Sequence, residues 1–340
     1  MGVHGKAAGM KQSIHVSRRD ALKTMAAGVM SAAVPGAFGQ ENSDGKRRMT
    51  INLQCGMIGV RANQREAIDL AHAHGFESVE AMPNDLARMS DSEVKDLLAE
   101  MKSKKVVFGA SGLPVDFRGD EGRFVEGLKA LPRAADALQR AGVTRVGTWI
   151  SPGSNSLTYL ENFRQHARRL QEVVWVLRDR GIRLGLEYVG TKTLRDRYKF
   201  PFVHCMAETK ELLAEIKLPE AGFVLDSWHW WNANESADDI LTLKAEQIVA
   251  VDLNDAPAGI PKEKQIDGQR ELPMATGVIP VGEFLIALQK LGYDGPVRAE
   301  PFNKPLNELS NEEACAKTAE AIWKGFALIK VSDGKGRRKQ

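Results

Sequence analysis

The feature that constrains this chain most is a regular alternation of β-rich and helical segments from residue 50 onward. Short β-rich runs occur at residues 50–55, 78–82, 106–110, 145–150, 183–189, 222–225, 248–253 and 297–300. Between and after them, apolar residues recur with helical spacing at 63–74, 90–104, 124–140, 157–180, 205–216, 236–243, 281–291 and 311–328. Eight such β-α units, about 35 residues each, predict an α/β fold: a single (β/α)8 TIM barrel over residues 50–330.

Local signals mark the ends of several predicted helices. Ser90 followed by Glu93 predicts a capping box at the start of one helix. Four helical patterns end in a glycine just before the next strand, at Gly75, Gly142, Gly181 and Gly292, as expected for a left-handed helix cap. A doubly wound sheet is the competing fold. The chain has neither a Gly-x-Gly-x-x-Gly turn after its first strand nor a Gly-Lys-Ser/Thr loop, so no dinucleotide or nucleoside triphosphate site is predicted.

Residues 1–39 resemble a bacterial twin-arginine export signal. Arg18 and Arg19 precede an apolar run, 24–38, that carries no charge and is too short to span a bilayer. An amphipathic N-terminal helix fits poorly, because the apolar residues do not alternate with polar ones. We therefore predict export to the periplasm, no stable membrane anchor, and a linker over residues 40–49.

The charge balance changes once the predicted signal is set aside. It contains five of the 47 basic and one of the 44 acidic residues, which leaves 42 and 43, a net charge near −1. No nucleic-acid-binding surface is predicted from such a balance. The basic tail, 331–340, is interpreted as a solvated terminus. Cys55, Cys205 and Cys315 show no metal-type spacing and predict no disulfide framework.

Four consecutive predicted strands deliver a carboxylate at the same end of the barrel. They are Glu187, Asp226, Asp252 and Glu300, and His229 follows three residues after Asp226. The carboxyl ends of barrel strands carry the chemistry in this fold. Four anions gathered there would repel one another strongly unless a positive charge offset them. A bound divalent cation is the simplest candidate, so a metal site is predicted.

The chain resembles the sugar phosphate isomerase/epimerase group of the xylose-isomerase-like barrels, which includes ketose 3-epimerases and inosose-processing enzymes. The resemblance covers about Ile51 to Leu328. It rests on five stretches: L-E-Y (186–188), L-D-S-W-H (225–229), V-D-L-N-D-A (251–256), R-E-L-P-M-A-T-G-V-I-P (270–280) and E-P-F-N (300–303).

The resemblance implies a metal site and a reaction. Family members bind one divalent metal through two glutamates, an aspartate and a histidine, which correspond here to Glu187, Asp226, Asp252 and Glu300. Asp252 stands where the family has the histidine, and an all-carboxylate set favours Mn²⁺ or Mg²⁺, with Co²⁺ and Zn²⁺ left open. The two glutamates are implied as the acid and base that move a proton next to a sugar carbonyl.

Substrate contacts are implied for His229 and Arg270, and Trp228 is predicted to stack on a sugar ring. Trp149, Trp230 and Trp231 either share that role or fill space near the barrel mouth. Asp116 and Arg118 form either a surface ion pair or a rim of the substrate site.

Three functions stay open at this stage. The first is isomerisation or epimerisation of a non-phosphorylated sugar or keto-sugar. The second is a lyase or dehydratase reaction on a keto-sugar, inosose or 3-keto-glycoside at the same metal site. The third is sugar binding without catalysis. The expected partner is a small sugar, not a nucleic acid, and homo-oligomerisation stays open.

Overall fold

The structure is a computed structural model that describes Gly2 and residues 47–329. The predicted export signal, the first part of the linker and the basic tail lie outside the described residues. The chain already contacts the barrel at Arg47, which pairs with Glu77 at 2.6 Å and lies over the ring of Trp323. Within the described part of the chain, no helix has both the length and the apolar character needed to cross a membrane.

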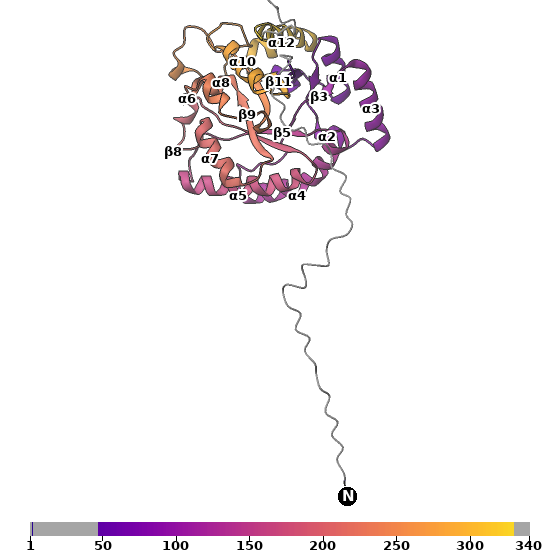
Figure 1. Ribbon diagram of the computed structural model, residues 1–340, viewed down its shortest axis with the longest axis vertical. Helices are drawn as coiled ribbons and strands as arrows, with labels where there is room; N and C mark the ends of the chain where they lie inside the picture. The colour runs from indigo at the N-terminus through magenta and orange to yellow at the C-terminus, as the bar shows by residue number, and fades with distance from the viewer. Residues whose placement is uncertain (1, 3–46, 330–340) are drawn as a thin grey trace, which may run out of the picture. The chain divides into compact units, whose positions relative to one another are not determined.

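The strands form one parallel sheet that closes into a barrel (Figure 1). Its order is β3 (Val107–Phe108), β2 (Ser78–Val79), β1 (Thr50–Leu53), β11 (Pro296–Ala299), β10 (Ile248–Leu253), β9 (Ala221–Asp226), β7 (Arg183–Glu187), β5 (Arg145–Trp149) and β4 (Ser111–Gly112). Only Gly109 and Ala110 separate β3 from β4, so these two segments are one interrupted strand that joins both ends of the sheet. The predicted α/β barrel is therefore confirmed.

Gly109 is required where the interrupted strand bends. A Cβ atom at this position would lie 2.1 Å from Oδ1 of Asn52, a buried side chain on β1. The sequence pattern predicted a continuous strand here, because a two-residue interruption leaves the apolar pattern nearly unchanged.

Helices surround the sheet, and α4 and α5 run along the lower edge in Figure 1. The helices are α1 (Gln64–Ala73), α2 (Pro83–Leu86), α3 (Asp91–Lys104), α4 (Glu121–Arg140), α5 (Tyr159–Arg178), α6 (Lys192–Arg195), α7 (Met206–Ile216), α8 (Ser227–Asn232), α9 (Ala237–Leu241), α10 (Val281–Leu291), α11 (Lys304–Asn307) and α12 (Asn311–Phe326). A separate two-stranded antiparallel sheet pairs β6 (Gly153–Ser154) with β8 (Phe200–Pro201). The four-residue helices, α8 and this small sheet were not predicted.

The predicted helix ends are confirmed. Ser90 and Glu93 form the capping box of α3, with the Ser90 N–H donating to the Glu93 carboxylate at 2.7 Å. The four predicted glycine caps all have positive φ, between 70° and 78°. Such φ values are strained for residues with a Cβ atom, so these glycines let each helix end and the chain return to the sheet.

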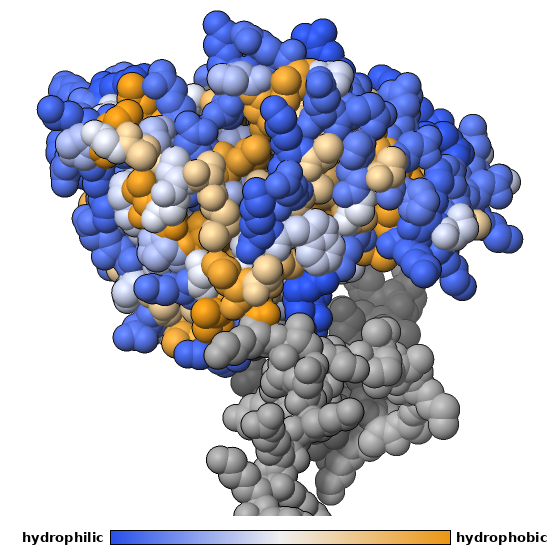
Figure 2. All heavy atoms as spheres, turned by 90° about the horizontal axis from the view of Figure 1, so that it is seen from above, coloured by the Kyte–Doolittle hydropathy of each residue, from blue (hydrophilic) through white to orange (hydrophobic). Residues whose placement is uncertain are grey.

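The outward faces of the helices keep the barrel polar on its surface. Figure 2 shows hydrophilic side chains over most of one face, with a band of apolar side chains between them. The central strands are buried along their whole length: all six residues of β9 and all six of β10 are buried. This rigid interior fixes the direction of the side chains that leave the carboxyl ends of the strands.

Candidate active site

The structure brings the four predicted carboxylates together at the carboxyl ends of the strands. Glu187 and Asp226 end β7 and β9, Asp252 lies near the end of β10, and Glu300 follows β11 directly. All four side chains are buried. Oxygen atoms of Glu187, Asp252 and Glu300 lie within 4.8 Å of one another, and so do ligand atoms of Glu187, Asp226 and His229.

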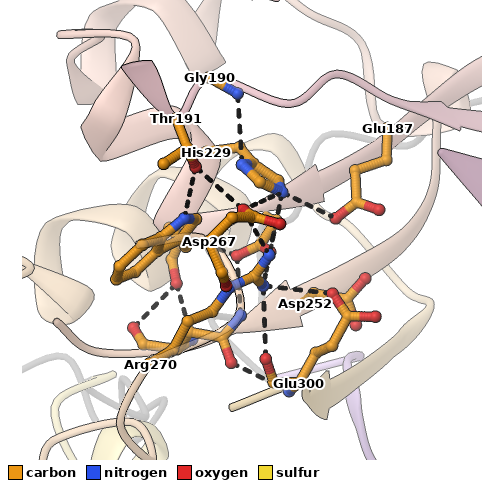
Figure 3. Close-up of polar contacts among 12 residues, drawn as sticks. Glu187, Gly190, Thr191, His229, Asp252, Asp267, Arg270 and Glu300 are labelled. Atoms are coloured by element: carbon orange, nitrogen blue, oxygen red, sulfur yellow. Dashed lines mark hydrogen bonds and ion pairs between the residues drawn. The ribbon is translucent and has the colours of Figure 1, made fainter. Parts of the chain in front are cut away.

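Two buried arginines lie among these acids. Arg270 was predicted as a substrate contact, whereas Arg298 had no predicted role. Figure 3 shows the Arg270 guanidinium among the carboxylates of the site. Its Nη1 donates to Asp226 at 2.7 Å and to Glu300 at 3.2 Å, and its Nη2 donates to Asp267 at 3.1 Å. Part of the negative charge is thus balanced by the protein itself.

Arg298 forms a two-pronged ion pair with Asp252. Both residues belong to neighbouring strands and are register partners in the sheet. Nε of Arg298 donates to one carboxylate oxygen and Nη2 donates to the other, at 2.9 Å. Both oxygens of Asp252 therefore pair with Arg298, while the carboxylate also lies within reach of those of Glu187 and Glu300. Paired arginine and carboxylate groups of this geometry are among the strongest charge-assisted contacts in proteins.

Asp226 is held by three donors. Its Oδ1 caps α8 by accepting the Trp228 N–H at 2.7 Å and also accepts Nδ2 of Asn254 at 2.9 Å, while Oδ2 faces Arg270. Burial raises the pKa of Asp226 to about 6, although the positive charge of Arg270 opposes this effect. Asn254 also accepts the backbone N–H of Glu300 and so ties β10 to the strand end of β11.

Glu187 and Glu300 are the least satisfied carboxylates. Oε1 of Glu187 is buried without a hydrogen-bond partner. Nε2 of His229 lies 3.8 Å from this oxygen. Burial, with the adjacent carboxylate of Glu300, raises the pKa of Glu187 well above its ordinary value. Burial and the charge of Asp252 raise the pKa of Glu300 to about 8. The protonated form is therefore favoured for both groups, and Glu300 can hold or release a proton near neutral pH.

His229 is oriented by the backbone. The N–H of Gly190 donates to Nδ1 at 3.3 Å, which places the ring proton of the neutral imidazole on Nε2. Nη2 of Arg270 also lies 3.2 Å from Nε2, but carboxylate oxygens of Glu187, Asp226 and Asp267 each lie 3.8 Å from the same nitrogen, which favours a proton on Nε2. Burial, then the charge of Arg270, lowers the pKa of His229 to about 3, so the ring stays neutral. An Nε2–H group suits hydrogen bonding to an oxygen better than metal ligation.

The aromatic residues separate into buried and exposed members. Trp228, predicted to contact substrate, is fully buried; its Nε1 donates to Thr191 at 2.8 Å and its ring lies 5.3 Å from the Arg270 guanidinium. The Trp228 ring therefore helps to hold Arg270 in position. Trp230 is also buried, and donates to the backbone of Ser236. Trp149, at the end of β5, is 43% exposed and is the register partner of Glu187.

Asp255 organises the loop that carries Arg270. Its carboxylate accepts the backbone N–H groups of Thr276 and Gly277 at 2.9 and 2.7 Å, and that of Ile279 at 3.0 Å. These bonds fold the loop between β10 and α10 back over the barrel mouth. The acid that ends the V-D-L-N-D stretch thus shapes the site without taking part in it.

Two site residues were missed by the sequence reasoning. Arg298 lies two residues before Glu300, and strand alternation places both side chains on one face, which could have revealed it. Asp267 accepts Nη2 of Arg270 and Oγ1 of Thr191. It lies in an irregular loop, where no periodic signal could have pointed to it.

The residues of the site fit a divalent cation by charge and by donor type. The five carboxylates of Glu187, Asp226, Asp252, Asp267 and Glu300 face only two guanidinium groups. The carboxylates thus outnumber the guanidinium groups, and Oε1 of Glu187 is buried without a hydrogen-bond partner. Oxygen ligands of this kind suit Mn²⁺ or Mg²⁺. Glu187 and Glu300 are the residues best placed to hold the ion, with Asp226 beside them.

Two curated relatives catalyse different reactions. An L-ribulose 3-epimerase of Methylomonas sp. is 24% identical over 72% of this chain and 80% of its own length. A 3-dehydroshikimate dehydratase of Pseudomonas aeruginosa is 25% identical over 70% of this chain. The chain spans only 36% of that dehydratase, so the similarity concerns one part of the larger enzyme.

Solved structures share the fold. A xylose isomerase domain protein from Alicyclobacillus acidocaldarius is 30% identical, with a TM-score of 0.73 over 83% of this chain and 99% of its own. The zinc-containing IolI protein has a TM-score of 0.69 at 19% identity, over 83% of this chain and 99% of its own. Residues 68–323 match the family described as "Xylose isomerase-like TIM barrel". The chain therefore belongs to the xylose isomerase-like TIM barrel family.

Proposed function

We propose that this protein is a metal-dependent isomerase or epimerase of a non-phosphorylated sugar or keto-sugar. The reaction is the removal of a proton from the carbon next to a carbonyl, through an enediolate, and its return to the substrate. The observation that carries the proposal is the pair Glu187 and Glu300, two buried carboxyl groups with raised pKa values at one barrel mouth.

The two glutamates differ in their surroundings, which suits unlike roles. Glu187 has one oxygen without a partner, so it is the better placed to take a proton from carbon. Glu300 is held through Oε2 by Arg270, which fixes its direction and leaves its other oxygen to give a proton back. A bound divalent cation supplies Lewis acidity that makes the substrate C–H more acidic.

The other buried groups of the mouth position the substrate. His229 presents Nε2–H to a substrate oxygen, and Gly190 keeps the ring in that state. Arg270 is committed to Asp226, Asp267 and Glu300. We therefore assign Arg270 mainly to holding the carboxylates, in addition to the substrate contact that its motif implies.

A lyase or dehydratase is the second candidate, and the dehydratase relative favours it. Loss of a β-substituent begins with the same proton abstraction, so the same two glutamates would serve. The reactions differ in their products, because epimerisation conserves the mass of the sugar and elimination does not.

The experiment is a screen of ketoses, inososes and 3-keto-glycosides in D₂O with Mn²⁺ or Mg²⁺ present. Mass spectrometry and NMR then report deuterium incorporation and product mass together. We expect Glu187→Gln and Glu300→Gln each to abolish incorporation, while Glu283→Gln, on the exposed start of α10, keeps it. Exchange that persists in both site variants would refute the proposed scheme.

We also propose that the protein acts outside the cytoplasm, on the strength of residues 1–39 alone. Replacing Arg18 and Arg19 together by lysine should retain the chain in the cytoplasm. Fractionation of cells that express the two forms tests this, and equal periplasmic amounts of both would exclude export by the twin-arginine route.

A further inference from the structure

Arg118, in the loop after β4, is a half-buried cation without a counterion. Its Nη1 donates to the backbone oxygen of Trp149 at 2.6 Å and to Oγ1 of Thr148 at 3.1 Å. No carboxylate of the described residues forms an ion pair with it, and the nearby Asp116 instead accepts the backbone N–H groups of Arg118 and Gly119. The surface ion pair considered from the sequence is therefore not formed.

Two aromatic rings hold the Arg118 guanidinium. Its central carbon lies 4.3 Å from the ring centroid of Trp149 and 4.7 Å from that of Phe117. The hydrogen bonds that the structure shows for its side chain come from Nη1 alone. Stacking of a guanidinium leaves its edge free to meet a planar acceptor. Burial lowers the pKa of Arg118, which agrees with a cation that lacks a partner.

The same arginine lines a cavity of about 670 Å³ beside the barrel mouth. Trp149, Ser151, Asn155 and His166 also line it. His166 is buried, and its Nε2 has no hydrogen-bond partner, while its Nδ1 is bonded to the backbone of Asn162. The cavity is therefore lined by a cation that forms no ion pair, and by a histidine whose buried Nε2 has no hydrogen-bond partner, within the described part of the chain.

The cavity adjoins the proposed catalytic residues through Trp149. Trp149 is the register partner of Glu187, and the Ile150 N–H donates to the Glu187 backbone oxygen at 2.8 Å. Neighbouring strands lie about 4.8 Å apart. A ligand held at Arg118 and the exposed Trp149 ring would thus lie beside the strand that ends in Glu187.

We propose that Arg118 and Trp149 form a subsite for the carboxylate of a sugar acid. The assignment rests on the proposed function, because it takes the bound sugar to be the substrate. One planar guanidinium matches one planar carboxylate through two parallel hydrogen bonds. A phosphate dianion fits less well. Asp120 and Glu121 also line the cavity, and the single positive charge of Arg118 would face the two negative charges of the phosphate. The substrate class is accordingly acidic keto-sugars or glycosides that contain a uronic acid.

The test measures binding of D-galacturonate and D-galactose to metal-free protein in EDTA by calorimetry and tryptophan fluorescence. EDTA removes metal chelation by the acid, and neither measurement needs turnover, so the result is independent of the D₂O experiment. We expect the acid to bind on the order of tenfold more tightly than the neutral sugar. Arg118→Gln should remove this preference.

Two further variants keep the test decisive. Arg118→Lys retains the charge without the planar edge and should keep only part of the preference. Arg123→Gln, at an exposed arginine in α4 that faces Asp120 at 3.5 Å, should bind both sugars as the unmodified protein does. Equal affinities for the two sugars, no binding of either, or a preference that survives Arg118→Gln would overturn the proposal. Tighter binding of galactose 6-phosphate than of galacturonate would overturn the assignment to a carboxylate.

Discussion

Arg298 donates from two nitrogens to the carboxylate of Asp252, its partner on the neighbouring strand, at the centre of the acidic barrel mouth. The pair is buried, and its two charges cancel where the resemblance implies a metal-binding histidine. The Arg298–Asp252 pair has no net charge, and neither would a neutral histidine side chain at position 252. The exchange therefore preserves the charge of the site, and we expect Arg298 to compete with a metal ion for the carboxylate of Asp252.

Arg298→Gln should consequently tighten metal binding. It frees Asp252 and removes a positive charge near the ion, which we expect to raise the affinity for Mn²⁺ roughly tenfold or more. Because a buried carboxylate then lacks its partner, the metal-free protein should lose about 3–5 kcal/mol of unfolding free energy. Calorimetric titration with Mn²⁺ and urea unfolding measure the two effects.

The control is Arg180→Gln, which removes a surface pair with Asp136 and should change neither quantity appreciably. Unchanged or weaker Mn²⁺ binding in Arg298→Gln would show that the Arg298–Asp252 ion pair does not keep Asp252 from binding the metal.

Metal binding should release protons and strengthen as the pH rises. Burial raises the pKa of Glu300 to about 8 and that of Glu187 well above its ordinary value, so the metal-free site favours protonated carboxyl groups. A cation must displace these protons to reach the carboxylates. Titrations at pH 6, 7 and 8, in buffers that differ in ionisation enthalpy, count the protons released. An affinity that stays constant over this range contradicts the prediction.

The same glutamates should make the metal-free fold less stable at higher pH. The folded-state pKa of Glu300 lies above its ordinary value of 4.5, so the folded protein binds the proton more tightly than the unfolded chain. Its contribution is complete below about pH 4.5 and disappears as the pH rises through about 8. Urea unfolding in EDTA from pH 5 to 8.5 should show this decline. Glu300→Gln should flatten it, and a decline of the same size in that variant would assign it to other groups.

Trp228→Phe tests whether the buried indole supports Arg270 or contacts substrate. The change removes the Nε1 bond to Thr191 and part of the ring beside Arg270. We expect a loss of about 1–3 kcal/mol of unfolding free energy, with sugar affinity little changed. Trp175→Phe, on the exposed face of α5, is the matched control. Weaker sugar binding at full stability would instead show a direct contact.

Much of the fold and of the acid cluster followed from periodicity alone. A carboxylate that ends a buried strand, as Glu187 does, has its direction set by strand alternation, and parallel strands in a barrel bring such ends together. The helix caps could also be predicted from local sequence. A capping box such as Ser90 with Glu93, or a glycine cap such as Gly142, depends on residues only a few positions apart.

The charge partners of the acids depended on long-range packing instead. Whether Arg298 faces Asp252 is decided by the register between β10 and β11, which no local pattern encodes. Asp267 lies only three residues before Arg270, but both reach the acids of the site because the loop between β10 and α10 folds back over the mouth, held by Asp255. The aromatic run after Asp226 turned into α8 and was mostly buried, because its side chains pack between the sheet and the loops.

Gly190→Ala should disturb His229 through the backbone. A Cβ atom at residue 190 would lie 2.5 Å from the backbone oxygen of His229 and 3.1 Å from the Ala233 nitrogen. Neither atom can move without shifting α8, so we expect a cost of about 1–3 kcal/mol. The N–H that fixes the His229 tautomer also moves away, so ¹⁵N NMR of histidine-labelled protein should change from one Nε2–H form to a mixture.

Gly268→Ala, where a Cβ meets nothing within 4 Å, should leave the stability and the tautomer as they are. A single Nε2–H form in Gly190→Ala would mean that Arg270 and the neighbouring carboxylates, not the backbone, set the state of this histidine.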